Sequence, residues 1–337
     1  MLPIYNGIGI LADNPASPLS GNKGFKLKPY IDGAIDDKRG GLIGFGSAYS
    51  NFLLSLALNC HQVGLQSIGI VCGDEQAARA LNPVLSIAKA CGMRFQFVSR
   101  QEYRLRHSAD YANALVEKYP GFSIVPEGGS SSEAAVNCGE LIQGYRDNSY
   151  SNTHWLIAAG TGATGAGVAA AMLPTQRAFV VSVTNDAEVP ANIRTLAQSI
   201  CAQQSEQSTT EQQPDCVLDQ RLNIVSAVRP PRFGKLDRDL CFIVSECHEA
   251  TGILLDPVYT VRVLQTYDQL RKQESAYDGA PVLVHTGGLS GWLAQPETLN
   301  GWLSKSTMQA IERLHDCYHQ LPDNCGDIDF AAGDTDV

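Results

Sequence analysis

Short runs of hydrophobic residues alternate along the chain with longer stretches whose hydrophobic positions recur every three or four residues. The short runs are typical of buried strands, and the longer spacing predicts helices with one buried face. We predict strands at residues 42–45, 67–71, 94–98, 123–125, 155–159, 178–183, 241–244 and 282–285. We predict helices at residues 50–63, 75–90, 108–118, 132–144, 165–173 and 190–201. This alternation indicates an α/β fold with mostly parallel sheets and helices on both faces.

Two polar segments interrupt this pattern. Residues 203–215 are rich in Gln, Ser, Thr and Glu, which predicts a solvated loop and not a site. Residues 323–337 contain several Asp and little apolar surface, so we expect a frayed tail.

The composition narrows the function classes. With 337 residues, 44% of them hydrophobic, the chain can form one large domain or two ordinary ones. Its formal net charge of -10, without a basic stripe, argues against binding of nucleic acid or of an anionic membrane surface. No apolar stretch is long enough to span a bilayer, and the N-terminus lacks a basic region followed by a long apolar run. We therefore expect a cytoplasmic protein.

The ten cysteines include no Cys-x-x-Cys pair, so zinc-ribbon and thioredoxin-type motifs are absent from the sequence. Several cysteines, such as Cys72 and Cys241, lie in apolar runs. We interpret them as buried free thiols in a reducing compartment, and the sequence predicts no metal site.

A glycine-rich turn follows the predicted strand at 155–159 and opens a helix. Its residues are Gly160, Thr161, Gly162, Ala163 and Thr164. Glycines let backbone N–H groups approach a phosphate, the helix N-terminus favours negative charge, and the threonines add hydroxyl donors. The turn therefore predicts an anion site; the alternative is a tight turn without a ligand.

The same turn also satisfies the Gly-x-Gly-x-x-Gly pattern of dinucleotide-binding folds, with Gly160, Gly162 and Gly165. That interpretation requires an acidic residue at the end of the next strand to bind a ribose. The candidate, Asp186, lies beyond the strand, and the turn is in the middle of the chain. A nicotinamide-dependent oxidoreductase remains an alternative.

Two further segments carry candidate chemistry. Lys23, in a Gly-Asn-Lys sequence, supplies an amine whose pKa burial would lower enough for nucleophilic and basic roles. The alternative is a surface lysine like the neighbouring Lys26 and Lys28. Ser50 and Asn51 directly precede an apolar helix, whose free N–H groups could bind a carboxylate. The alternative there is an ordinary helix cap.

Six motifs in order give the chain a family resemblance. They are Gly-Asn-Lys at 21–23, Gly-Phe-Gly-Ser-Ala-Tyr-Ser-Asn at 44–51, Pro-Glu-Gly-Gly-Ser at 126–130, the glycine-rich turn at 160–167, Asp-Pro-Val-Tyr-Thr at 256–260 and His-Thr-Gly-Gly at 285–288. In this combination the chain resembles the 1-aminocyclopropane-1-carboxylate deaminase and D-cysteine desulfhydrase family. These enzymes use pyridoxal 5'-phosphate (PLP) and have the tryptophan synthase β-subunit fold, known as fold type II.

The resemblance implies an architecture. Family members have two open, mostly parallel three-layer α/β domains with the cofactor cleft between them, and the smaller domain is inserted in the larger. On this chain the large PLP-binding domain would comprise residues 1–36 and 152–337, and the smaller domain residues 37–151. Members of the family are commonly homodimers.

The resemblance also implies roles for residues that hold the cofactor. Lys23 matches the lysine that bonds covalently to PLP, and Asn51 matches the residue beside the oxygen of the PLP ring. Residues 160–164 match the phosphate-binding turn. Thr260 matches the residue that faces the pyridine nitrogen. A neutral threonine there favours an unprotonated nitrogen and hence α,β-elimination, whereas the deaminase branch carries Glu at this position.

For the substrate, Ser50 matches a residue that helps hold the carboxylate, and Tyr259 matches a tyrosine that assists the leaving group. Phe52 stands where the family has His or Gln, and Phe233 stands where it has Tyr. The segment before Lys23 and residues 261–263 also depart from the pattern. These departures leave the residues that match the cofactor-binding positions unchanged, and they alter residues that match the substrate-binding positions.

We therefore predict a PLP-dependent lyase that acts on D-cysteine or a similar β-substituted amino acid, giving a keto acid, ammonia and sulfide. One alternative is a 1-aminocyclopropane-1-carboxylate deaminase. Another, suggested by Phe52 and Phe233, is a catalytically impaired protein that binds PLP or an amino acid.

Overall fold

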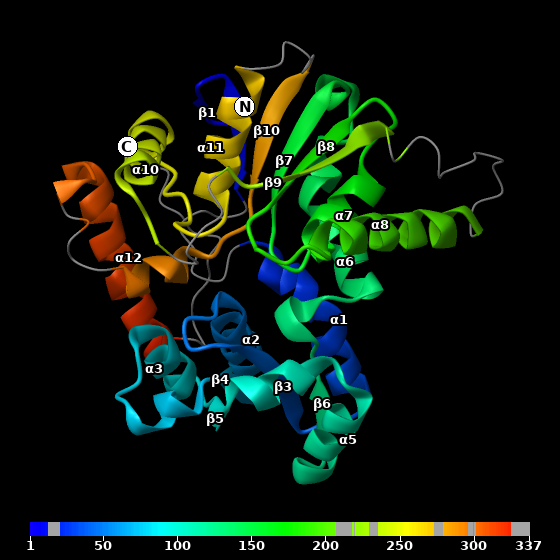
Figure 1. Cartoon of the computed structure of the whole chain (residues 1–337), viewed down its shortest axis with the longest axis vertical. Helices are drawn as coiled ribbons and strands as arrows, with labels where there is room; N and C mark the ends of the chain where they lie inside the picture. The colour runs from blue at the N-terminus through cyan, green and yellow to red at the C-terminus, as the bar shows by residue number, and fades with distance from the viewer. Residues whose placement is uncertain are drawn as a thin grey trace.

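The structure, a computed structural model, describes residues 1–12, 21–206, 218, 220–228, 235–272, 279–295, 299 and 301–324. Its described residues form two sheets (Figure 1). The larger has the strand order β1 (Ile4–Tyr5), β2 (Ile8–Ala12), β10 (Ala280–His285), β7 (Thr153–Ala159), β8 (Arg177–Ser182) and β9 (Leu222–Ser226). The smaller has the order β5 (Arg94–Val98), β4 (Gln66–Cys72), β3 (Gly41–Ser47) and β6 (Phe122–Ile124).

All neighbouring strands in both sheets are parallel, except that β1 pairs antiparallel with β2. The strands of the smaller sheet lie within residues 37–151, and those of the larger sheet lie outside that range. The division into two domains at these boundaries stays a prediction.

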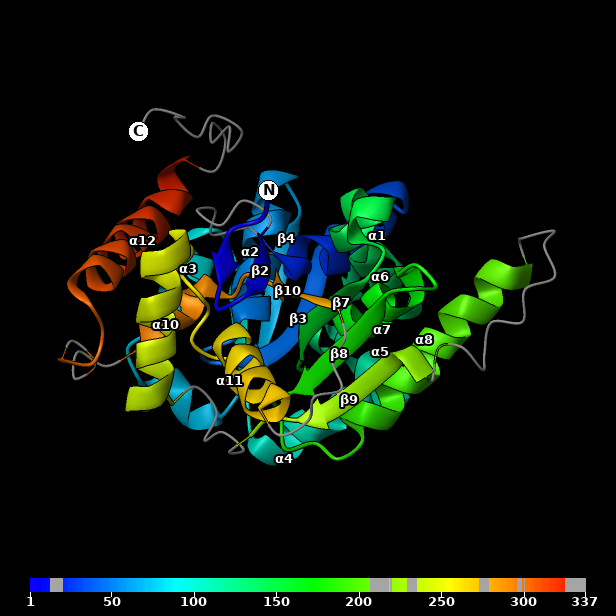
Figure 2. The ribbon, with the colours of Figure 1, turned by 90° about the horizontal axis from the view of Figure 1, so that it is seen from above.

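Helices connect and cover the sheets (Figures 1 and 2). They are α1 (Asn22–Asp36), α2 (Asn51–Gln62), α3 (Pro83–Ala90), α4 (Arg100–Tyr103), α5 (Ala109–Lys118), α6 (Ser132–Cys138), α7 (Ala163–Ala171), α8 (Val189–Glu206), α10 (Arg238–Thr251), α11 (Thr260–Arg271) and α12 (Lys305–Asn324). Short 3-10 turns are η1 (Asp74–Ala78), η2 (Arg104–His107), η3 (Glu127–Gly129), η4 (Gly139–Tyr145), η5 (Asn148–Tyr150) and η6 (Leu289–Ala294).

One predicted strand is wrong. Residues 241–244 lie inside α10, which Asp237 begins by accepting a hydrogen bond from Leu240 N at 3.0 Å. Cys241 and Val244 are buried while Phe242 is 60% exposed, which is the burial of a helix face and not of a strand in a parallel sheet. A run of adjacent apolar residues cannot by itself distinguish a strand from a helix.

Other boundaries also differ from the prediction. Residues 203–206 belong to α8 and not to a loop, while residues 207–215 lie outside the described part of the chain. The predicted helix at 75–90 is divided into η1 and α3, because Pro83 begins a helix more readily than it continues one. In the predicted tail, α12 continues to Asn324, and residues 325–337 are not described.

The described cysteines, eight of the ten, are free thiols, and five of them are buried. None of the described helices combines the length and apolar character needed to cross a membrane.

Parallel strands bring their carboxyl ends to one edge of a sheet, where ligands of α/β proteins bind. Here the carboxyl ends of both sheets face one cavity. Ser47 at the end of β3 and Cys72 at the end of β4 line it from the smaller sheet. Gly160 after β7, Thr184 after β8 and Thr286 after β10 line it from the larger sheet. The fold therefore places one site between the two sheets.

Candidate active site

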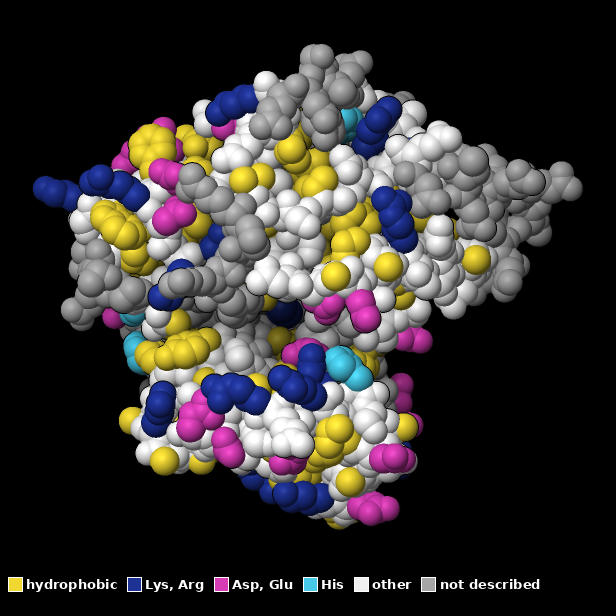
Figure 3. Space-filling view, in the orientation of Figure 1, with side chains coloured by type: hydrophobic (Ala, Val, Ile, Leu, Met, Phe, Trp, Pro, Cys, Tyr) yellow, Lys and Arg dark blue, Asp and Glu magenta, His cyan; other side chains and the backbone are white. Residues whose placement is uncertain are grey.

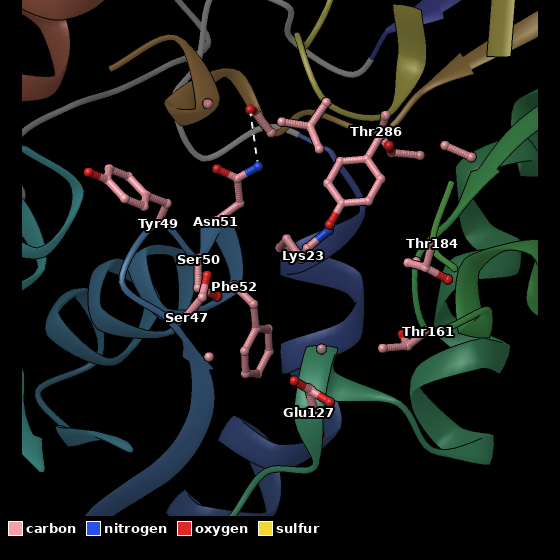
Figure 4. A pocket seen from close by; sticks show the side chains of 18 of the residues that line it. Lys23, Ser47, Tyr49, Ser50, Asn51, Phe52, Glu127, Thr161, Thr184 and Thr286 are labelled. Atoms are coloured by element: carbon pink, nitrogen blue, oxygen red, sulfur yellow. Dashed lines mark hydrogen bonds between the residues drawn. The ribbon is translucent and has the colours of Figure 1, made fainter. Parts of the chain in front are cut away.

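The cavity between the two sheets has a volume of about 1150 Å³. It opens as a hollow across the middle of the face seen in Figure 3. Figure 4 shows Lys23 in its interior, with Ser50, Asn51 and Phe52 on one side and Thr161 and Thr184 on the other.

Lys23 is the second residue of α1, and it is partly buried and lines the cavity. Its Nζ donates a hydrogen bond to Asn22 Oδ1 at 2.6 Å. Burial, followed by repulsion from Lys26, lowers the pKa of Lys23 from 10.5 to about 7. A substantial fraction of this amine is therefore neutral near physiological pH, as a nucleophile or proton acceptor requires.

Gly21 sets the position of Lys23. Its φ of 93° is in the region that favours glycine, and a Cβ there would lie 2.3 Å from Thr286 O. The next residue, Asn22, donates its N–H to the same oxygen at 3.3 Å. Glycine thus lets α1 begin against the loop that follows β10.

The glycine-rich turn begins α7 with unsatisfied donors. Gly162, at a φ of 98°, is the N-cap residue and contributes no side-chain cap. The N–H groups of Ala163, Thr164 and Gly165 have no hydrogen-bond partner among the described residues. Because the helix dipole adds to these donors, this end of the cavity suits a phosphate.

The two threonines of this turn join it to the rest of the site. Thr161 Oγ1 accepts from Ser130 Oγ at 2.6 Å and from Lys26 Nζ at 3.4 Å. Thr164 Oγ1 accepts from Asn22 Nδ2 at 2.6 Å. The turn is thereby linked to α1 and to the segment that follows η3.

Two residues at the end of the cavity formed by this turn, which we call the phosphate end, were not predicted from the sequence. Lys26 is 4% exposed, and burial lowers its pKa. Its position three residues after Lys23 in a helix puts both amines on one face, a signal that was available in the sequence. Thr184 lines the cavity with a buried hydroxyl that has no partner in the described structure, and no local motif marked it.

The N-terminus of α2 forms another part of the cavity wall. Ser50 caps the helix, since its Oγ accepts a hydrogen bond from Leu53 N at 3.2 Å. The N–H groups of Asn51 and Phe52 have no partner among the described residues, so they can bind a carboxylate. The cap and the binding role predicted for Ser50 are compatible, because its hydroxyl can still donate.

Asn51 connects α2 to the loop after β10. Its Nδ2 donates to Gly288 O at 3.2 Å (Figure 4), and its Oδ1 accepts from the Ser290 hydroxyl. The Phe52 side chain is 5% exposed and packs over Gly44 and Gly129. Phe52 therefore offers its backbone N–H, while its ring fills a space between α2 and η3.

Tyr259 lines the cavity near Gly160, 3.4 Å from the point that a Cβ of that glycine would occupy. Burial is the main cause that raises the pKa of the Tyr259 hydroxyl, with further contributions from Asp256 and Glu127. The hydroxyl therefore stays protonated and can donate a hydrogen bond or a proton.

Thr260 lies behind this wall and does not line the cavity. Its hydroxyl donates to Asp256 Oδ2 at 3.0 Å, and its N–H donates to the same atom at 2.6 Å. Asp256 also accepts from the N–H groups of Val258 and Tyr259. The predicted role of Thr260 at a pyridine nitrogen stays a prediction, and Phe233 lies outside the described residues.

A comparison with protein-family models finds no match. Among curated proteins, the chain is 26% identical over 297 residues to the mitochondrial bifunctional D-cysteine desulfhydrase/1-aminocyclopropane-1-carboxylate deaminase of Arabidopsis thaliana, covering 81% of this chain and 70% of that relative. It is 26% identical over 293 residues to a Thermotoga maritima protein provisionally named a 1-aminocyclopropane-1-carboxylate deaminase, covering 83% and 88% of the two chains.

Among solved structures, the chain is similar to that of a homologue of 1-aminocyclopropane-1-carboxylate deaminase. The TM-score is 0.69 at 20% identity, over 84% of this chain and 85% of the other. The resemblance predicted from the six motifs is confirmed by these relatives, and so is the predicted α/β fold, type II among PLP enzymes.

Proposed function

We propose that this chain is a PLP-dependent lyase that catalyses α,β-elimination from D-cysteine or a similar β-substituted amino acid. The observation that carries the proposal is the partly buried Lys23 amine, with its lowered pKa, in a cavity that is also lined by two helix N-termini with free N–H groups. The name of the Arabidopsis thaliana relative, which covers both a desulfhydrase and a deaminase, supports this reaction class.

The residues at the phosphate end fit PLP. The N–H groups at the start of α7, the Thr161 and Thr164 hydroxyls and the Lys26 amine would hold the phosphate, and the unpartnered Thr184 hydroxyl adds a donor. Lys23 would hold the cofactor covalently. When bound, PLP supplies an electron sink that makes the α-hydrogen of an amino acid acidic.

Lys23 Nζ is the proposed base. When Nζ is not bonded to the cofactor, it would take the α-proton of the substrate, because its pKa of about 7 allows proton exchange near neutral pH. Asn22 Oδ1, 2.6 Å from Nζ, would hold the amine in the cavity during this exchange.

The N-terminus of α2 is the proposed carboxylate site. The N–H groups of Asn51 and Phe52, with the Ser50 hydroxyl, would orient the substrate. Because these are backbone donors, the loss of a polar side chain at Phe52 leaves this contact in place. The aromatic ring changes only the wall beside the substrate.

Tyr259 is the proposed acid for the leaving group. Its hydroxyl stays protonated because burial raises its pKa, so it can protonate a departing thiolate. The Cβ–S bond breaks with its electron pair on sulfur, and water then releases a keto acid and ammonia. D-cysteine plus water would give pyruvate, sulfide and ammonia.

The visible absorption spectrum of the protein with added PLP tests the proposal, with wild type beside Lys23→Ala, before and after D-cysteine. We expect a Lys23-dependent band that changes when substrate is added, together with pyruvate and sulfide. A band without turnover of either D-cysteine or 1-aminocyclopropane-1-carboxylate would favour the catalytically impaired alternative. Absence of any Lys23-dependent band would overturn the PLP assignment and favour the dinucleotide alternative.

The proposal keeps three predictions, of which the resemblance implies the first two and the sequence composition the third. These are a small domain spanning residues 37–151, a homodimeric assembly and a cytoplasmic location. Sedimentation of the purified protein tests the assembly, and proteolysis near residues 36 and 151 tests the domain division.

A further inference from the structure

The cavity is larger than a cofactor and a small amino acid need. Its volume of about 1150 Å³ exceeds the roughly 300–1,000 Å³ of pockets that enclose drug-sized ligands. Part of its wall is the carboxyl edge of the smaller sheet, with Ser47, Cys72 and Glu127, and the adjacent Arg106 of η2. The N-terminus of α2 begins at the same edge. A substrate held there by its carboxylate can therefore extend a side chain along this edge.

Three contacts hold the Arg106 guanidinium in one orientation. Nε donates to Glu127 Oε2 at 2.6 Å, and Nη1 donates to Tyr103 O at 3.2 Å. The guanidinium carbon lies 4.7 Å from the centroid of the Tyr103 ring, which adds a cation–π contact. The Tyr103 hydroxyl donates to Glu127 Oε1 at 2.7 Å, so Glu127 is fixed as well.

One end of this guanidinium remains available. Nη2 makes no hydrogen bond to any described residue, although Arg106 lines the cavity and its side chain is 23% exposed. A guanidinium has only donors, so a ligand group at Nη2 must be an acceptor. An anionic acceptor makes the strongest such bond, and a side chain already held in place loses little freedom when it binds one.

The surrounding charges are compatible with an added anion. Glu127 accepts one hydrogen bond from Arg106 Nε and another from the Tyr103 hydroxyl. Its two carboxylate oxygens are therefore bound to groups other than Arg106 Nη2. His107, whose Nε2 lies 3.9 Å from Glu127 Oε2, is exposed next to them. Figure 3 shows Lys and Arg side chains and a His, with acidic side chains among them, along one edge of the hollow.

We propose that Arg106 binds a carboxylate at the far end of the substrate side chain. The substrate class is then a β-substituted amino acid whose leaving group carries an anion, and this rests on the elimination proposed above. In the reaction the α-proton goes to Lys23, the Cβ–S bond breaks with its electron pair on sulfur, and the thiolate leaves with its carboxylate intact.

Two matched compounds test this subsite, S-carboxymethylcysteine and its amide S-carbamoylmethylcysteine, each in both enantiomers. They have the same shape and the same thioether bond, and they differ in the charge at the far end. We expect the holoenzyme to turn over the acid with a kcat/KM about tenfold or more above that of the amide, as one charge-assisted hydrogen bond provides. Keto acid formation gives kcat/KM, and the ligand-induced rise in unfolding temperature gives binding without turnover.

The variants are Arg106→Gln, Arg106→Lys and, as a control, Arg100→Met. Arg100 is a neighbouring arginine that pairs with Glu75 at 2.5 Å and does not line the cavity. In Arg106→Gln the preference for the acid, measured as the ratio of the two kcat/KM values, should vanish. Arg106→Lys should retain part of the preference, and Arg100→Met should retain all of it.

The outcomes separate the subsite from the reaction. Equal kcat/KM for acid and amide in the wild type would overturn the subsite and leave the elimination proposal standing. If neither compound reacts, a larger rise in unfolding temperature with the acid, lost in Arg106→Gln, would support the subsite and count against elimination. If neither compound reacts and both raise the unfolding temperature equally, the subsite proposal is overturned.

Discussion

The two ends of the cavity are built differently. At the phosphate end, one short segment supplies most of the donors: Thr161 and Thr164 lie in a single turn, and Asn22 and Lys26 reach it from one helix. At the substrate end, the donors come from separate places, the start of α2, the start of α11 and η2. Because one turn supplies most of the phosphate site, substitutions outside that turn should affect phosphate binding little. At the substrate end each donor comes from a different segment, so a single substitution there can change the substrate specificity.

Lys23 joins the two ends, so Lys23→Ala should have the largest effect. Elimination should fall by roughly 10³-fold or more, because base and covalent link are both lost. The phosphate end should still bind PLP, with the absorption of the free aldehyde. Lys28→Ala is the control, since Lys28 is exposed and pairs with Asp32 at 2.6 Å. The absorption spectrum and the rate of elimination are measured for both variants. Full activity in Lys23→Ala would contradict the proposed role of Lys23.

Tyr259→Phe probes the substrate end alone. We expect kcat to fall about 10²-fold because the acid for the leaving group is removed, while PLP affinity stays the same. Steady-state kinetics and PLP titration measure the two quantities. Tyr145→Phe serves as the control, because Tyr145 packs against Tyr150 away from the cavity. A parallel loss of PLP affinity in Tyr259→Phe would mean that the two ends are not separable.

Lys26→Met probes the phosphate end and its effect on Lys23. PLP affinity should fall about tenfold, since a charge-assisted contact to the phosphate is lost. Removal of Lys26 also ends its repulsion of Lys23, so the pKa of Lys23 should rise. In the apoprotein, the rate at which the PLP band forms depends on the neutral amine. Its midpoint should move from about pH 7 to higher pH. Lys28→Met should move neither quantity.

Ser50→Ala should have the smallest effect. Loss of the α2 cap should lower the free energy of unfolding by about 1 kcal/mol. Ser99→Ala is a matched control, because Ser99 Oγ caps α4 by accepting from Glu102 N at 3.1 Å outside the cavity. Both variants should lose stability in denaturant titrations, but only Ser50→Ala should raise KM. An unchanged KM would remove Ser50 from the substrate site.

The contrast between a site formed by one segment and a site formed by several also determines what the sequence could predict. The turn at 160–164 was identifiable because its glycines and threonines are adjacent in the sequence, and the structure places it at the start of α7. The contact between Arg106 and Glu127 was not predicted, because two segments 21 residues apart meet only after β6 joins its sheet. Such a contact leaves no local pattern.

Two other features have local causes. The segment 241–244 resembled a strand because four apolar residues are consecutive, and only the wider spacing from Leu240 to Cys247 reveals the helix face. The role of Thr260 at the cofactor, which the resemblance implies, stays a prediction, and in the structure its hydroxyl donates to the buried Asp256 carboxylate. A buried carboxylate needs several donors, and nearby groups supply them.

The neighbouring amines of Lys23 and Lys26 have a consequence for folding. Unfolded, Lys23 keeps its ordinary pKa of 10.5, whereas in the fold burial and Lys26 lower the pKa to about 7. Between these two pH values the unfolded chain binds more protons, so the apoprotein gains stability as pH rises through this window. A ligand that binds only the folded state adds stability according to its concentration. A phosphate-bearing cofactor would thus serve as a counterion that helps this chain to keep its fold.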